Sequence, residues 1–183
     1  MAVLAVFLLQ FVAGPSVFPA QEQTYQVGLH TFELNYLNPA GHIQTADAAV
    51  WYPSSDTAET YTYQKNISSY LAVDGELADN AAPYPLIIFN HGFNGSEMQS
   101  LFLKEKLAEE GYIVASVHFD DGIWSSIFEF LNLDDYPLDS GIDGYLHTTY
   151  EKYFDTFRLP VAEALLDYMI QENKRPESLF FQG

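Results

Sequence analysis

The segment 90–96 (Asn-His-Gly-Phe-Asn-Gly-Ser) gathers residues suited to chemistry at a carbonyl oxygen or an anion. It follows a short apolar run, and ligands of open α/β sheets bind where such strands end. Its two glycines let the main chain approach a substrate closely. Backbone N–H groups at such a position, and at the helix N-terminus beyond it, can stabilise an oxyanion. The alternative is a tight turn in which His91 is a hydrogen-bonded structural imidazole.

The elements on either side of this segment predict a strand–helix–strand unit. Residues 85–90 and 112–117 are continuous apolar runs, the pattern of strands buried on both faces of a sheet. Ser96 and Gln99 have the spacing of a capping box that opens a helix, and Gly111 is a candidate C-cap. The predicted core side of this helix carries Met98, Leu101, Phe102 and Ala108, and the predicted solvent side carries Lys104, Glu105, Glu109 and Glu110.

The flanking segments complete an α/β prediction. Residues 24–36 and 48–52 predict two strands joined by a turn at 38–41, which makes an N-terminal antiparallel hairpin. Residues 54–83 are polar and irregular and predict a surface excursion. The helical period of 160–172 predicts a helix that covers the sheet. The fold class is therefore α/β, with a mostly parallel sheet behind the hairpin.

Composition excludes several classes of function. Seven Lys and Arg against 25 Asp and Glu give a net charge of −18. This charge repels nucleic acid and anionic lipid head groups, so neither is an expected partner. The chain has no cysteine, which excludes disulfides, thiolate metal sites and a cysteine nucleophile.

Residues 1–20 predict a signal peptide, and residues 21–183 a folded domain. The apolar run from Ala2 to Ala13 is too short to span a bilayer and fits the core of a secretory signal cleaved near Ala20. We therefore expect a secreted or periplasmic protein, or otherwise a cytoplasmic one in which this run is a buried first strand or helix.

Residues 120–150 predict an acidic, aromatic insertion or partial lid. From Asp120 to Glu151 there are eight acidic residues and no Lys or Arg. Part of it, 139–144, is similar to a calcium loop but has Gly at the third position, so a solvated acidic loop is the default. His30, His42, His118 and His147 lack histidine partners at helical spacing, and no metal is predicted. His118 ends the second apolar run, where it either lines a site or packs in the core.

Three stretches carry a resemblance to a known family: 84–93 (Tyr-Pro-Leu-Ile-Ile-Phe-Asn-His-Gly-Phe), 107–115 (Leu-Ala-Glu-Glu-Gly-Tyr-Ile-Val-Ala) and 49–53 (Ala-Val-Trp-Tyr-Pro). Together they resemble the α/β-hydrolase superfamily, most closely the platelet-activating factor acetylhydrolase-like and dienelactone hydrolase-like esterases. The similarity extends over 24–183, with the strong motifs at 84–117.

The resemblance implies specific roles for residues of the segment 90–96. The backbone N–H of Phe93 would form half of an oxyanion hole, Gly92 would permit the approach, and His91 would be a structural neighbour. The Phe93 side chain would line an acyl pocket. We accordingly predict Gly92 and Phe93 as catalytic backbone positions and His91, Phe93 and His118 as substrate-binding residues, with no cofactor.

The resemblance also implies that the catalytic serine lies further along a longer chain. No Gly-x-Ser-x-Gly occurs in the sequence, and in this superfamily the serine, acid and histidine follow in that order. We therefore expect the N-terminal portion of a serine esterase for a short-chain acyl or lipid acetyl ester, truncated before the nucleophile strand and inactive alone. The alternatives are a cutinase- or lipase-like polyesterase and a noncatalytic binding module of hydrolase-like fold. Oligomeric state is not predicted.

Overall fold

The computed structural model describes residues 24–63, 67–78, 83–92, 95–119, 154 and 158–174. The predicted signal peptide at 1–20 and the predicted insertion or partial lid at 120–150 lie outside these residues and stay predictions. Within the described ranges, no helix is long and apolar enough to cross a membrane.

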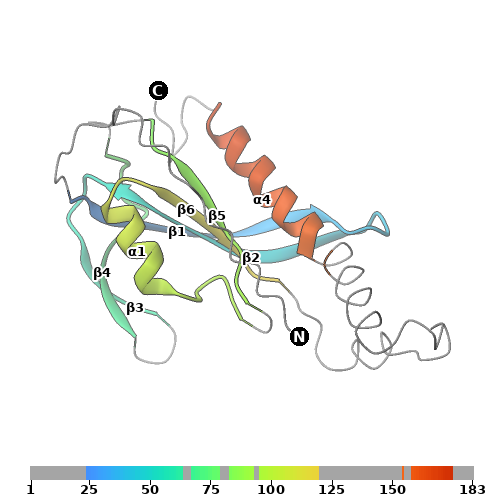
Figure 1. Cartoon of the computed structure of the whole chain (residues 1–183), viewed down its shortest axis with the longest axis horizontal. Coiled ribbons are helices and arrows are strands. Elements are labelled where there is room, and N and C mark those ends of the chain that lie inside the picture. The colour runs from blue at the N-terminus through green and yellow to red at the C-terminus, as the bar shows by residue number, and fades with distance from the viewer. Residues whose placement is uncertain are drawn as a thin grey trace, which may run out of the picture.

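The core of the fold is a six-stranded sheet with the strand order β3-β4-β1-β2-β6-β5 (Figure 1). The strands are β1 (Gln26–Leu37), β2 (Ile43–Ser54), β3 (Glu59–Thr62), β4 (Ser68–Val73), β5 (Leu86–Phe89) and β6 (Ile113–Val117). The predicted hairpin is confirmed, because β1 and β2 pair antiparallel along their whole length. Its turn is closed by Asn38, whose Oδ1 accepts hydrogen bonds from the N–H groups of Ala40 and His42.

The predicted strand–helix–strand unit is confirmed as β5, α1 (Leu101–Glu109) and β6, with β5 and β6 parallel. Gly111 ends the helix with φ +90°. The N–H of Gly111 bonds to the carbonyl of Ala108 and that of Tyr112 to the carbonyl of Leu107, the pair of bonds that defines a Schellman motif. Only glycine takes this φ without strain, so the predicted C-cap is the physical reason that the chain turns into β6 here.

Helices cover the sheet on both faces, which makes three layers (Figure 1). The predicted second helix is α4 (Leu159–Glu172). Because side chains alternate along a strand, Val50 and Tyr52 join the core under α4, whereas Ala49 and Trp51 join the core under α1. The architecture is therefore α/β, as predicted.

Three predictions about the sheet are wrong. A mostly parallel sheet was predicted, but among the described strands β1–β2, β2–β6 and β3–β4 are antiparallel and only β1–β4 and β5–β6 are parallel. The segment 54–83 was predicted as a surface excursion, but it contains β3 and β4, which extend the sheet beyond β1. In addition, β5 was predicted to be buried on both faces. It pairs only with β6 among the described residues, and this edge position leaves all four of its residues partly exposed.

The predicted faces of α1 are also wrong in part. The helix begins at Leu101 after Ser100, rather than at Ser96. Lys104, predicted in solvent, is 0% exposed, and Phe102, predicted in the core, is 78% exposed. The side of α1 that packs in the protein carries Lys104 and Ala108, both buried. Lys104 tolerates burial because of its contacts, described below.

Candidate functional site

His91 ties the end of β5 to the end of β6. Its Nε2 accepts a hydrogen bond from the backbone N–H of Phe119 at 2.9 Å, so the ring proton resides on Nδ1, which donates to the carbonyl of Gly92 at 2.7 Å. The side chain is 2% exposed. A histidine this buried holds the backbone groups around it in place. Its predicted direct contact with a substrate stays a prediction.

Arg158 holds the same loop from the start of α4. Its Nη1 donates to the carbonyl of His91 at 2.9 Å, and its guanidinium lies 4.8 Å from the centre of the Phe119 ring. This contact with a backbone carbonyl was not predicted from the sequence. The loop is therefore fixed by groups 28 and 67 residues away in the chain.

The N–H of Gly92 points away from the ladder of backbone hydrogen bonds in the sheet. It donates to Oε1 of Gln99 at 2.6 Å, and the carbonyl of Gly92 accepts from the N–H of Gly95 at 3.0 Å. Gln99 was predicted only as part of a helix cap, and nothing in the sequence indicated this contact. Gly92 is exposed. Its N–H therefore points to the surface of the loop, where the Gln99 oxygen accepts the hydrogen bond. Phe93, the other predicted oxyanion residue, lies outside the described residues.

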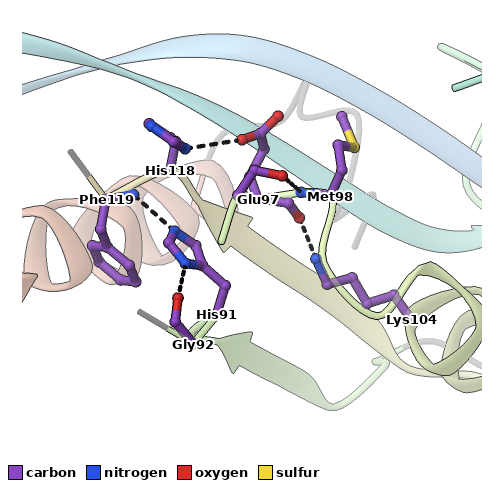
Figure 2. A network of polar contacts seen from close by, with 8 residues as sticks. His91, Gly92, Glu97, Met98, Lys104, His118 and Phe119 are labelled. Atoms are coloured by element: carbon purple, nitrogen blue, oxygen red, sulfur yellow. Dashed lines mark hydrogen bonds and ion pairs between the residues drawn. The ribbon is translucent and has the colours of Figure 1, made fainter. Parts of the chain in front are cut away.

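His118 lies beside this loop, as its place after β6 predicted. Its ring stacks 5.8 Å from that of His91, and its Nδ1 lies 3.5 Å from Oε2 of Glu97 (Figure 2). The imidazole is partly exposed, whereas Glu97 is 7% exposed. Sequence reasoning missed Glu97 because it lies in a turn without periodicity. The structure thus brings together His91, Gly92 and His118, three of the four predicted site residues.

Lys104 anchors the turn that carries Glu97. Its ammonium group donates to the backbone carbonyl of Glu97 (Figure 2). The same group lies 4.4 Å from the Trp51 ring and 4.6 Å from the Phe89 ring. Burial lowers the pKa of Lys104 to about 7, while the charge of Glu97 acts in the opposite direction. The two aromatic faces and the carbonyl offset part of the desolvation, which explains how a lysine can occupy the core here.

A cavity of about 570 Å³ opens between the turn at 97–98 and the strands β1, β2 and β3. Its walls include the aromatic residues Phe32, Tyr61 and Tyr63 and the carboxylates Glu33, Asp47 and Glu97. Glu97 therefore contributes both to this cavity and to the pair with His118. No basic side chain of the described residues lines the cavity.

The arrangement can bind an oxygen or a polar group, but it contains no evident nucleophile in its described part. Ser96 Oγ accepts from the N–H of Met98, and Ser116 is buried in β6 with an Oγ that has no hydrogen-bond partner. Among the described residues there is also no cluster of three or more His, Asp or Glu side chains that could hold a metal ion.

Comparison with known proteins gives no family. No protein-family model and no curated protein matches the chain. Among solved structures, the chain is similar to a ferulic acid esterase from Streptomyces cinnamoneus, with 23% sequence identity and a TM-score of 0.45. The match covers 56% of this chain and 36% of the esterase, so it spans about a third of that enzyme. The functional argument therefore rests on the geometry of the site.

Proposed function

We propose that this chain is the N-terminal part of a serine carboxylic ester hydrolase, in which the loop after β5 binds the oxyanion of the tetrahedral intermediate. The observation that carries the proposal is the N–H of Gly92, which leaves the sheet ladder and donates to a side-chain oxygen, Oε1 of Gln99. Oxyanion donors must lie within about 2.7–3.1 Å of the developing charge. An amide already directed at an oxygen at 2.6 Å has the required direction.

Rigidity of the loop supports the same proposal. Donors stabilise a transition state best when they need no reorganisation. His91 is hydrogen-bonded through both ring nitrogens and through its own carbonyl, which accepts from Arg158. The main chain before and at Gly92 is thus held from β6 and from α4. In the proposed mechanism a substrate carbonyl oxygen displaces the Gln99 side chain, and the N–H of Phe93 adds a second donor.

The remaining chemistry would come from residues that follow Gly183 in a longer chain. A serine would attack the ester carbon and form an acyl-enzyme, with release of the alcohol, and a histidine–acid pair would move the proton. The substrate would be a short-chain acyl or lipid acetyl ester, and the protein would act outside the cytoplasm. The present chain alone would be inactive.

The proposal is tested by the coding sequence and then by kinetics. A Gly-x-Ser-x-Gly after a short apolar strand should follow Gly183, and the longer protein should hydrolyse p-nitrophenyl acetate in a reaction that an organophosphate abolishes. The absence of this motif, or turnover that resists the inhibitor, would refute the serine mechanism and favour a binding module.

Two glycine variants then separate catalysis from folding. A Cβ at Gly92 would meet only the Gln99 side chain, at 3.5 and 3.7 Å, so Gly92→Ala should fold normally. It would crowd the oxygen that Gly92 N–H must reach, and we expect kcat to fall roughly 10- to 100-fold. The control, Gly111→Ala, forces alanine to φ +90° and should lower stability by about 1 kcal/mol with kcat retained. An unchanged kcat in Gly92→Ala would exclude this amide from catalysis.

A further inference from the structure

Lys104 lies in the first turn of α1 and is 0% exposed, so its ammonium group is shielded from water. The group has three partners: the backbone carbonyl of Glu97 and the rings of Trp51 and Phe89. These partners replace only part of the lost hydration, because burial still lowers the pKa of Lys104 to about 7. A movement that returns the side chain to water is therefore favoured more strongly when Lys104 is charged than when it is neutral.

The start of α1 lacks the features that normally fix the first turn of a helix. Ser100, at the N-cap position, makes no side-chain hydrogen bond to the helix, and the first turn carries no acidic residue. Ser100 also has φ +61°, in the left-handed region that is unfavourable for a residue with a Cβ. Release of the turn before α1 would relieve this strain, so Ser100 is placed to act as a hinge.

The ionisable groups around Lys104 come from several elements. On the turn before α1, the Glu97 carboxylate acts to raise its pKa and is itself paired with His118 at the end of β6 (Figure 2). β2 and β5 pack aromatic rings against it, and the β2 ring bonds to Tyr63, whose pKa is raised by burial so that it stays neutral. On α1 itself, Glu105 accepts a hydrogen bond from a serine of β4.

We propose that residues 96–104 open as a local unit about Ser100, and that the charge of Lys104 makes this opening more frequent as the pH falls. Opening returns the ammonium to water and withdraws Gln99 from the N–H of Gly92, with which it is now bonded. Acid would thus free the amide for a substrate oxygen, and only this consequence rests on the proposed ester hydrolysis. A protonated His118 would hold Glu97 more firmly and act in the opposite direction, so the sign of the pH effect identifies the group responsible.

Native-state hydrogen exchange of the chain, followed by NMR between pH 6.5 and pH 8.5, measures the opening. The opening constant of an amide is its exchange rate divided by the intrinsic rate at the same pH. For the N–H groups of Leu103 and Lys104, which bond to the carbonyl of Ser100, this constant should fall about 20-fold over the range, because the pKa is about 7 in the buried state and 10.5 in water. The Gly92 N–H should follow the same curve.

Amides at the centre of the sheet separate local opening from global unfolding. Val50 and Ala115 are paired between β2 and β6, and their opening constants should be at least about tenfold smaller than those of the α1 amides. Equal constants at both places would mean that α1 opens only with the whole fold, and this would overturn the proposal. So would a constant for Leu103 that stays level or rises with pH, whereas a Gly92 amide that does not follow would overturn the release of Gln99.

Three variants assign the pH dependence to one side chain. Lys104→Met removes the titrating group, so the opening constant should be flat with pH. The matched control, Lys106→Met, removes an exposed lysine of the same helix and should keep the 20-fold fall. His118→Asn should keep it as well. A fall that persists in Lys104→Met, or that disappears in either other variant, would refute the role of Lys104. No ester is used, so the outcome does not depend on whether the longer protein is an esterase.

Discussion

Replacing Lys104 with methionine tests the energetics of the buried ammonium at the centre of the site. In the native chain, burial lowers the pKa of Lys104 to about 7, whereas in the unfolded chain the group should titrate near 10.5. Methionine has a similar length and carries no charge, so it removes the titration with little change in volume. The variant loses the hydrogen bond to the Glu97 carbonyl and the contacts with two rings, but it also avoids the cost of burying a charge.

The sign of the pH effect follows from proton binding. Between pH 7 and pH 10.5 the unfolded chain keeps the lysine proton and the native chain has released it, so native stability rises with pH across this window. Below pH 7 Lys104 is charged in both the native and the unfolded chain, so the native state carries the full cost of burying this charge. The difference of about 3.5 pH units corresponds to about 5 kcal/mol in total, or about 1.4 kcal/mol per pH unit. Relative to Lys104→Met, the unaltered chain should therefore gain about 2.7 kcal/mol between pH 7.5 and pH 9.5.

Urea unfolding of both proteins at several pH values measures this gain. Every other titrating group is shared, so the difference between the two curves isolates Lys104. Lys106→Met is the control: Glu110 and Glu109 raise the pKa of this exposed lysine, so its protonation does not change in this range. Its stability difference should be flat with pH. A difference for Lys104→Met that is equally flat would mean that Lys104 titrates normally, and the argument from burial would be refuted.

Three further substitutions have expected outcomes that urea unfolding also measures. Gly28→Ala should lower stability by at least about 1–3 kcal/mol, because the new Cβ would lie 2.3 Å from a ring carbon of the buried Tyr52 side chain; an unchanged midpoint would show that the strand can shift. Arg158→Gln should cost about 1–3 kcal/mol through loss of the hydrogen bond to His91, and a neutral effect would contradict the role of Arg158 in holding the loop. Phe102→Asn should change stability by less than about 0.5 kcal/mol, because that side chain is 78% exposed; a larger loss would indicate that it is covered.

The parts of the fold that sequence predicted well are those set by local patterns. Alternating apolar residues and a turn with Asn38 identified the hairpin of β1 and β2, and the crossover unit followed from two apolar runs around a helix. Gly111 identified the helix end because a positive φ is needed there. The position of His118 beside the loop of His91 also followed, since the carboxyl ends of neighbouring parallel strands meet.

The wrong or missing predictions concern features that depend on contacts between residues far apart in the sequence. β3 and β4 are short strands. β4 pairs with the edge of β1 and β3 pairs in turn with β4, so both depend on partners that no local pattern in 54–83 reveals. Charge alone placed Lys104 in solvent. Its burial depends on the Trp51 and Phe89 rings, contributed by β2 and β5, and on a carbonyl seven residues earlier. Gln99 and Arg158 were missed for the same reason, since each acts on the backbone of a segment with which it shares no periodicity.

The loop after β5 receives its restraints from both layers of helix, and this has a consequence for how the site can form. Gln99 reaches Gly92 from the side of α1, whereas Arg158 reaches His91 from the start of α4 on the opposite face of the sheet. A loop held from one face only would keep the freedom to rotate its amides about the strand axis. Contacts from two faces remove this freedom, so the direction of the Gly92 N–H should depend on the docking of both helices. Loss of either contact should therefore loosen the same amide, even though the two side chains are 59 residues apart and belong to different layers.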